Sequence, residues 1–278
     1  MVRIIKYAIL DTDFVSKTNI IHNKGAVLAD ELLSFPDYVF FCHQKMADEL
    51  SVHGSEGTNK WLNEKVNNGK IVLYDDKRII DELKQQIGSK CYNYYCSFLR
   101  QGCDIFDKQF YVKFFCQLDG LLSEAEENNI NSSCFLKQLA NCERRIGHQQ
   151  NLGEIKAFVL SQALKFLYDA VETCIFCSDD FDARRGFANA GLMKCVSFIA
   201  IFYKFWRMGK MKEEVSPYYQ NFVKWCSERK NPQTHLKVWI KKEGAYKREP
   251  VDIITLFDDI FDGKYQVRMD GDLQKICR

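Results

Sequence analysis

Long apolar runs are missing from this chain of 278 residues. A helix that spans a membrane needs roughly 18 or more consecutive apolar residues. The most apolar stretch, Cys195 to Tyr203, ends at Lys204, well short of that length. Residues 1–10 lack the apolar segment of a secretory signal and have the pattern of a buried strand. We therefore expect a soluble, cytoplasmic protein that has no membrane partner.

The sequence also lacks internal repeats, low-complexity linkers and a marked excess of charge, since its net charge is +2. Without a linker, separate hinged domains are not required. The balanced total conceals a local difference. Residues 203–248 carry twelve Lys or Arg and four Glu, whereas residues 249–278 carry seven acids and four bases. A basic stretch before an acidic tail hints at a polyanionic partner.

Cysteine is plentiful, with twelve residues, but its positions do not suggest disulfides. Most lie within apolar patterns such as Phe114-Phe115-Cys116, where a thiol behaves as a small hydrophobic group. Cys174 and Cys177 form a C-x-x-C within a predicted strand. Positions i and i+3 of a strand point to opposite faces, so neither zinc binding nor redox pairing is expected. We predict reduced thiols throughout.

Strand and helix patterns alternate along most of the chain. The predicted strands are 3–10, 38–42, 70–74, 172–178 and 194–199, and the predicted helices include 25–35, 59–68, 153–168 and 181–190. This alternation predicts an α/β domain over residues 1–202 with a central, mainly parallel sheet. Residues about 75–146 are helix-patterned and are predicted to form a helical insertion. Residues 203–278 are predicted to be a C-terminal extension on the same domain, helical and basic at first, then acidic with turns.

Acidic residues lie at the ends of predicted strands or on adjacent predicted helices, where they could converge at the carboxyl ends of a parallel sheet. They are Asp11, Asp13, Glu49, Glu154, Asp179, Asp180 and Asp182. In such sheets ligands bind in the crevice at the carboxyl ends. Clustered carboxylates repel one another unless a cation lies among them. Magnesium binds a few carboxylates together with phosphate oxygens, so the set predicts metal-assisted hydrolysis of a phosphodiester.

Each acid also has a purely structural interpretation. Asp11-Thr12-Asp13 suits a turn with a helix cap, and Glu49 suits a solvated helix residue. Glu154 is a favourable charge at a helix N-terminus, and Ser178-Asp179-Asp180 suits a cap for the next helix. The placement of all of them around one predicted sheet favours a joint function.

Four short segments carry a resemblance to a known family. They are Ile9-Leu10-Asp11-Thr12-Asp13-Phe14, Lys45-Met46-Ala47-Asp48-Glu49-Leu50, Gly153-Glu154-Ile155-Lys156 and Ser178-Asp179-Asp180-Phe181-Asp182-Ala183-Arg184. They resemble the acidic motifs of the PIN-domain nucleases, which hold Mg²⁺ or Mn²⁺ and cleave RNA. The resemblance spans roughly residues 3–200 and implies a three-layer PIN-like fold with endoribonuclease activity. The stretch before Glu154 is longer than in compact members of that family, and the residues after Tyr203 have no counterpart.

Carried over residue by residue, the resemblance implies a set of site residues. The catalytic acids would be Asp11, Glu49, Glu154 and Asp180, which with Asp179 and Asp182 would also be the metal ligands. Asp13, Thr12 and Ser178 would have secondary roles. Of the five histidines, only His43 and His53 lie near Glu49 in sequence, where either is a candidate for a supporting role.

Two alternatives remain. Asp11-Thr12-Asp13-Phe14-Val15 also resembles the nucleophile motif of haloacid-dehalogenase-type phosphatases, in which Asp11 would be phosphorylated and Asp13 would be the general acid. The glycine-rich turn expected there is missing, because Ser16-Lys17-Thr18-Asn19 follows. The other alternative is a catalytically silent PIN-like module that binds RNA or protein.

The basic stretch mixes cations with aromatic residues, at Lys224, Trp225, Arg229, Lys230, Lys237, Trp239, Lys241 and Lys242. Single-stranded nucleic acid is bound in this way, by phosphate neutralisation and base stacking. A solvated helix face with core tryptophans is the simpler interpretation. RNA is favoured over DNA as the partner. An inhibitory protein partner, a homo-oligomer, endo- versus exonuclease action and the sequence specificity of cleavage all stay open.

Overall fold

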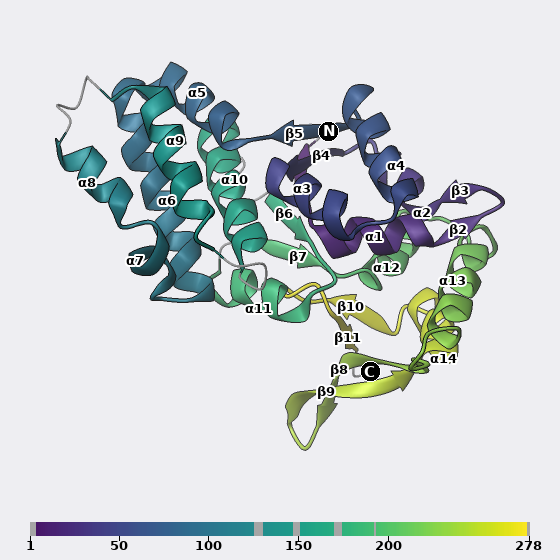
Figure 1. Ribbon diagram of the computed structural model, residues 1–278. Coiled ribbons are helices and arrows are strands. Elements are labelled where there is room, and N and C mark those ends of the chain that lie inside the picture. Colours follow the sequence, from purple (N-terminus) through teal and green to yellow (C-terminus); the bar gives the residue numbers. More distant parts are fainter. Residues whose placement is uncertain (1–3, 125–129, 147–150, 170–173, 192, 277–278) are drawn as a thin grey trace. The chain divides into compact units, whose positions relative to one another are not determined.

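The computed structural model describes residues 4–124, 130–146, 151–169, 174–191 and 193–276 (Figure 1). Its main sheet has five parallel strands, which in spatial order are β5 (Ile71–Tyr74), β4 (Tyr38–His43), β1 (Lys6–Leu10), β6 (Cys174–Cys177) and β7 (Lys194–Val196). The predicted α/β fold with a central parallel sheet is confirmed. In the part of the chain that the structure describes, no helix combines the length and apolar character of a membrane span.

The strands form where the sequence is almost continuously apolar. In β1, Ala8, Ile9 and Leu10 are at most 4% exposed, and all four residues of β6 are buried. Parallel strands that are covered on both faces need such runs, because neither face meets water. β1 pairs with β4 in the register Ala8 to Phe40.

The chain folds into two compact units. The first comprises Met1–Asp11 and Asp37–Cys174, and the second comprises Thr12–Pro36 and Ile175–Arg278. The helices of the first unit are α3 (Gln44–His53), α4 (Glu56–Asn67), α5 (Asp76–Ile87), η1 (Gly88–Lys90), α6 (Cys91–Phe106), α7 (Phe110–Phe114), α8 (Gln117–Glu124), α9 (Ser132–Glu143) and α10 (Leu152–Tyr168).

Within the described residues, the segment predicted as a helical insertion forms the helices α5 to α9, which short turns connect. Helices α5, α6, α9 and α10 lie side by side (Figure 1). Helix α10 packs against α6 and α5 as well as against β1, β4 and α3. Its residues are buried almost all round, which explains why its sequence is apolar on nearly every face. Helix α10 therefore joins the insertion to the first unit's share of the sheet.

The second unit contains a separate small sheet and several helices. They are α1 (Thr12–Ile20), β2 (His22–Asn23), β3 (Ala26–Val27), α2 (Leu28–Leu33), α11 (Phe181–Asn189), α12 (Ala200–Arg207), α13 (Lys212–Ser227), β8 (His235–Lys242), β9 (Ala245–Asp252), α14 (Ile253–Phe261), β10 (Tyr265–Val267) and β11 (Leu273–Lys275). The small sheet has the strand order β10-β11-β8-β9, and β2 and β3 form a two-stranded hairpin.

The expectation of a helical, basic segment after Tyr203 is wrong beyond α13. Residues 235–252 form an antiparallel hairpin instead, and Glu243 and Gly244 at its turn have φ values of 52° and 83°. Two successive residues with positive φ give a turn whose twist matches that of paired strands. Leu236, Val238 and Ile240 occupy every second position, a period of two that favours a strand.

Each of the eleven cysteines within the described residues is a free thiol. Cys174 and Cys177 lie in β6, as predicted. Cys277 lies outside the described part of the chain.

Candidate active site

Asp13 brings together two of the predicted acidic segments. It lies in the first turn of α1, directly after β1, and its Oδ1 accepts a hydrogen bond from the backbone N–H of Asp179 at 3.2 Å. The hydroxyl of Ser178 donates to the same oxygen at 3.5 Å. Asp13, Ser178 and Asp179 therefore lie together, although 166 residues separate Asp13 from Asp179 in sequence.

Lys17 provides a positive charge in this group. It forms an ion pair with the carboxylate of Asp179, whose Oδ1 also accepts a hydrogen bond from the N–H of Phe198 at 3.2 Å. The ammonium group of Lys17 lies 5.2 Å from the ring centroid of Phe198 and 5.7 Å from that of Trp225. Sequence reasoning missed Lys17. Lys17 could have been found from its position four residues after Asp13, because that spacing places both side chains on one face of α1.

Asp180 and Asp182 lie at the start of α11. The Oδ1 of Asp180 accepts hydrogen bonds from the N–H groups of Asp182 and Ala183 at 2.7 and 3.1 Å. Asp180 is thus the N-cap of α11, as its structural interpretation expected. The side chain of Asp182 is 82% exposed and lies 3.7 Å from Arg185.

Arg184 supports the loop that carries these acids. Its guanidinium group is only 2% exposed and donates from Nη1 to the carbonyl of Ser178 at 2.8 Å. Its other contacts are the carbonyl of Asp270 at 2.8 Å and the carboxylate of Asp272 at 2.5 Å. Burial raises the pKa of Asp272 despite the nearby guanidinium groups of Arg184 and Arg248. Asp270 and Asp272 therefore fix the guanidinium group that binds the carbonyl of Ser178.

Glu49 lies against the start of α10, which carries Glu154 in its first turn. The two carboxylate oxygens of Glu49 lie 2.9 and 3.1 Å from the point that a β-carbon at Gly153 would occupy. The absence of a side chain at Gly153 therefore makes room for Glu49. Two predicted site residues, 105 positions apart in the sequence, belong to neighbouring parts of the first unit.

A buried ionic network lies in the same unit. The fully buried ammonium group of Lys156 lies 2.8 Å from Asp76 Oδ2, 2.5 Å from Glu143 Oε1 and 2.8 Å from the hydroxyl of Tyr95. His43 Nε2 lies 3.2 Å from Asp76 Oδ1. Sequence reasoning did not predict this network, because its members come from five elements. Lys156 was visible only as part of the motif that contains Glu154.

The network changes the protonation of its members. Burial alone would raise the pKa of Asp76, but Lys156 and then His43 outweigh it and hold that pKa well below its usual value. Burial lowers the pKa of Lys156, whereas Asp76 and Glu143 raise it by more. Burial, followed by the charge of Asp76, raises the pKa of Tyr95 well above normal. The ionised pair of Asp76 and Lys156 is therefore the stable form.

His43 connects this network to α3. Its Nδ1 accepts a hydrogen bond from the N–H of Lys45 at 3.1 Å, so the ring caps the helix that carries Glu49. The other predicted supporting residue, His53, is exposed at the end of α3.

The predicted ligands fit a hard divalent cation by their chemistry. Asp11 is half-buried between β1 and α1, and it, Glu49, Glu154 and Asp180 offer only oxygen donors, which suit Mg²⁺ or Mn²⁺. Among the side chains that the structure describes, no group of three or more His, Cys, Asp or Glu could hold a metal ion. The juxtapositions that the structure does show are Asp13 with Asp179 and Glu49 with the first turn of α10.

The predicted nucleic-acid-binding residues lie on different elements. Lys224 and Trp225 are on α13, and Arg229 and Lys230 follow its end. The guanidinium group of Arg229 lies 4.8 Å from the centroid of Trp225, the same ring that Lys17 approaches. The other four, Lys237, Trp239, Lys241 and Lys242, are on β8.

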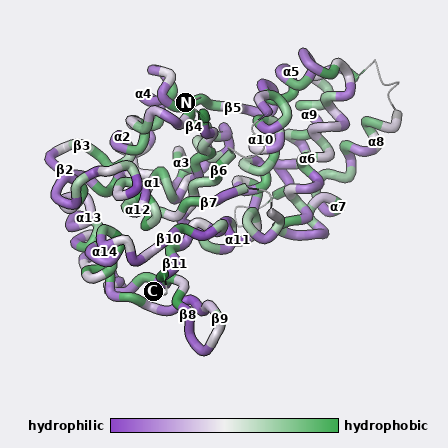
Figure 2. The backbone as a smooth tube through the Cα atoms, turned by 180° about the vertical axis from the view of Figure 1, so that it is seen from behind, coloured by the Kyte–Doolittle hydropathy of each residue, from purple (hydrophilic) through white to green (hydrophobic). Residues whose placement is uncertain are grey.

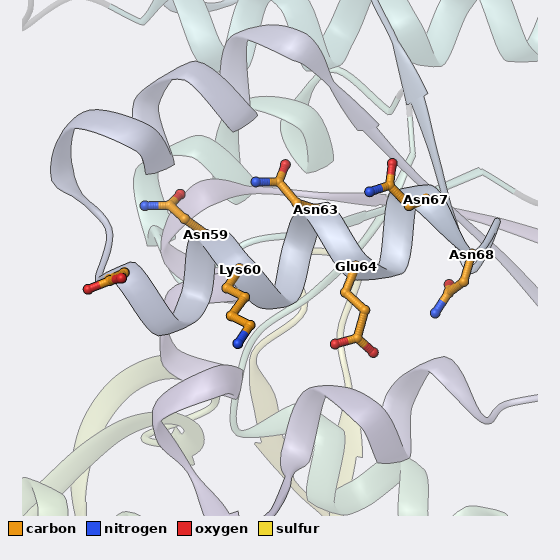
Figure 3. Close-up of a pocket in the computed structure, with 7 residues that line it drawn as sticks. Asn59, Lys60, Asn63, Glu64, Asn67 and Asn68 are labelled. Carbon is orange, nitrogen blue, oxygen red and sulfur yellow. The ribbon is translucent and has the colours of Figure 1, made fainter.

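Helix α4 borders a polar hollow in the first unit (Figure 3). Asn59, Asn63 and Asn67 recur every four residues and project from the same side of the helix, whereas Lys60 and Glu64 project from another side (Figure 3). None of the predicted acids lines this hollow. It therefore has no part in the candidate active site.

Comparisons with protein-family models, with curated proteins and with solved structures find no match to this chain.

Proposed function

We propose that this protein is a nuclease of the three-layer PIN-like type that depends on Mg²⁺ or Mn²⁺ and cleaves RNA internally. The proposal rests on one observation. Acids from segments far apart in the chain follow β4, β1 and β6, which are consecutive strands of one parallel sheet. The carboxyl ends of such strands are where ligands bind in α/β proteins.

The proposal assigns a role to each acid. Asp11, Glu49, Glu154 and Asp180 would hold the metal ion through carboxylate oxygens, directly or through water. When bound, the ion would supply an activated water molecule and neutralise charge on the phosphodiester. Asp182 would bind the metal ion only from its exposed position at the start of α11. Asp179 would be a further ligand and would share its carboxylate with Lys17, with which it forms an ion pair.

The chain's own residues would orient the substrate. Asp13 and Asp179 hold the segments after β1 and β6 together through the backbone N–H of Asp179. Lys17, close to the ring of Trp225, is a cation beside an aromatic surface. A phosphate bound here would compete with Asp179 for Lys17, with the ring of Trp225 beside it for a base to stack on, which supports a nucleic acid as substrate.

The phosphatase alternative gives Asp13 the role of general acid. In the structure, Asp13 Oδ1 accepts hydrogen bonds from both Asp179 N–H and the hydroxyl of Ser178. That arrangement uses this oxygen as an acceptor rather than as a proton donor. The phosphatase alternative also gives no role to Glu49, which lies against Gly153. We therefore favour the nuclease.

Cleavage of labelled single-stranded RNA by the full chain tests the proposal, in Mg²⁺, in Mn²⁺ and in EDTA. We expect cleavage with either metal ion, none in EDTA, and none for Asp11→Asn or Glu49→Gln. The matched control is Asp104→Asn, an exposed acid on α6, which should cleave as the unmodified protein does. Full activity of Asp11→Asn would refute the site. Phosphate release from p-nitrophenyl phosphate without RNA cleavage would favour the phosphatase. No activity on either substrate would favour the catalytically silent binding module.

A further inference from the structure

The two strands of the β8–β9 hairpin place alternate residues on opposite sides. The register pairs Trp239 with Arg248 and Lys241 with Tyr246, and Lys237 lies two residues before Trp239 on β8. Because side chains alternate along a strand and paired residues share a side, these five residues lie on one side of the hairpin. We call this side the hairpin face.

The opposite side of the hairpin belongs to the core and to ion pairs. Val238 is fully buried there, and α14 packs against β9. The lysines on this side have acidic neighbours. Lys242 lies 3.0 Å from Glu249, and Lys247 lies 3.5 Å from Glu243. This side is therefore close to electrically balanced.

Trp239 and Arg248 in the middle of the hairpin face contact Asp270 and Asp272, whereas the two lysines of this face carry uncompensated positive charge. Lys237 and Lys241 are both exposed, and neither has an ion pair with any residue that the structure describes. Tyr246, opposite Lys241, is 37% exposed. Figure 2 shows that the hairpin is largely hydrophilic toward its turn, and Figure 1 shows that the turn points away from α13 and α14. Two cations beside an exposed aromatic ring are complementary to a phosphate backbone with unstacked bases.

The hairpin face continues toward the candidate active site within the second unit. The guanidinium carbon of Arg248 lies 3.5 Å from the ring centroid of Phe181, the residue that directly follows Asp180. Arg248 is also held by Asp272 at 2.9 Å, the residue that pairs with Arg184. The cationic face and the loop that carries Asp180 are therefore connected by direct contacts.

We propose that the hairpin face is the docking surface for single-stranded RNA, with Lys237 and Lys241 contacting phosphates and Tyr246 stacking on a base. An RNA strand bound there would continue past Arg248 to Phe181 and Asp180. This inference rests on the proposed nuclease only for what happens to the bound strand. It narrows the predicted basic stretch to one side of β8 and β9, and it adds Tyr246, which the sequence did not single out.

Binding of a fluorescent single-stranded RNA to the full chain tests this surface, measured by anisotropy in EDTA so that no cleavage occurs. Lys241→Ala should weaken binding and reduce the slope of log affinity against log salt by about 0.7, the value for one phosphate contact to a single strand. Lys247→Ala is the matched control, because it removes the same charge from the other side of the same hairpin. Its affinity and salt slope should equal those of the unmodified protein.

Stacking is tested separately at Tyr246. Tyr246→Ala should lower RNA affinity roughly tenfold, whereas Tyr246→Phe keeps the ring and should bind normally. Equal losses in Lys241→Ala and Lys247→Ala would overturn the hairpin face. Tighter binding of an RNA duplex than of the single strand would overturn the choice of partner.

The two proposals fail in different ways. If the unmodified protein cleaves RNA but Lys241→Ala and Tyr246→Ala bind it normally, the docking surface is wrong and the nuclease stands. If no cleavage occurs while both variants lose affinity, the docking surface stands and the nuclease is wrong.

Discussion

The carboxylate of Glu49 occupies the space that a side chain at Gly153 would need. Its nearer oxygen lies 2.9 Å from the position of a β-carbon at residue 153, closer than real β-carbons approach such atoms. Glu49 therefore lies against the first turn of α10, the turn that carries Glu154. Because the carboxylate is the end of a flexible side chain, a methyl group at residue 153 would displace the carboxylate rather than the backbone.

Gly153→Ala should consequently separate activity from stability. We expect RNA cleavage to fall and the metal concentration for half-maximal activity to rise, because Glu49 is displaced. The free energy of unfolding should stay equal or increase by up to about 1 kcal/mol, since alanine favours a helix over glycine. Gly120→Ala on α8 is the control, because nothing lies within 4 Å of its added methyl group. Cleavage by Gly153→Ala at the normal rate and metal dependence would count against Glu49 as a ligand.

Arg184→Ala should destabilise the protein by about 3–5 kcal/mol, because the buried carboxylate of Asp272 keeps only Arg248 as a guanidinium partner. The carbonyls of Ser178 and Asp270 also lose the buried donor that Arg184 provides. Urea denaturation measures this loss. Arg185→Ala is the comparison, since that side chain is 58% exposed and its pairing with Asp182 spans 3.7 Å. Its effect should stay within about 0.5 kcal/mol. Similar losses in both variants would mean that burial of Arg184 matters little.

The ion pair of Asp76 and Lys156 should make the free energy of unfolding depend on pH in the acidic range. The folded-state pKa of Asp76 lies below its ordinary value of 3.8, so its ionised form stabilises the fold above pH 3.8. That contribution is lost as the pH falls below 3.8 toward the folded-state pKa. At neutral pH, Asp76→Asn should lower the free energy of unfolding by about 3–5 kcal/mol, and the deficit should shrink below pH 3.8. Urea titrations at several pH values measure it, with Asp104→Asn as the control.

Gly271→Ala should cost more stability than the same change at another glycine of similar φ. Gly271 has a φ of 77°, and an added β-carbon would lie 2.7 Å from the backbone of Cys195 and Val196. Gly209 has a φ of 79° but nothing within 4 Å of such an atom. Gly209→Ala should cost about 1–2 kcal/mol through backbone strain alone. Equal losses by denaturant titration would mean that the contact with β7 contributes nothing.

The central strands were predictable because each is a short, almost wholly apolar run between polar segments. β1, β4, β5 and β6 all fall within or close to their predicted ranges. The hairpin was missed because its lysines suggested a solvated helix face. The two-residue period of β8 and the Glu243-Gly244 turn were visible in the sequence, but the many lysines favoured the helix interpretation.

The contacts around the acids were less predictable. Arg184 bonds to residues 86 and 88 positions later, and Lys156 binds Asp76, which is 80 positions earlier. No local spacing reports such pairs, because burial and partner are decided by tertiary packing. Lys17 is the exception, since its position one helical turn after Asp13 was visible in the sequence.

The backbone of residues 269–271 has a consequence for how the protein avoids self-association. β7 is the last strand of the parallel sheet, and its free side would be a template for a strand from another molecule. The N–H groups of Cys195 and Ser197 instead donate to the carbonyls of Met269 and Gly271, at 2.9 and 3.2 Å. A chain truncated before Met269 would expose these two backbone N–H donors. The edge of the sheet at β7 could then pair with a strand of another molecule, so the truncated protein should self-associate.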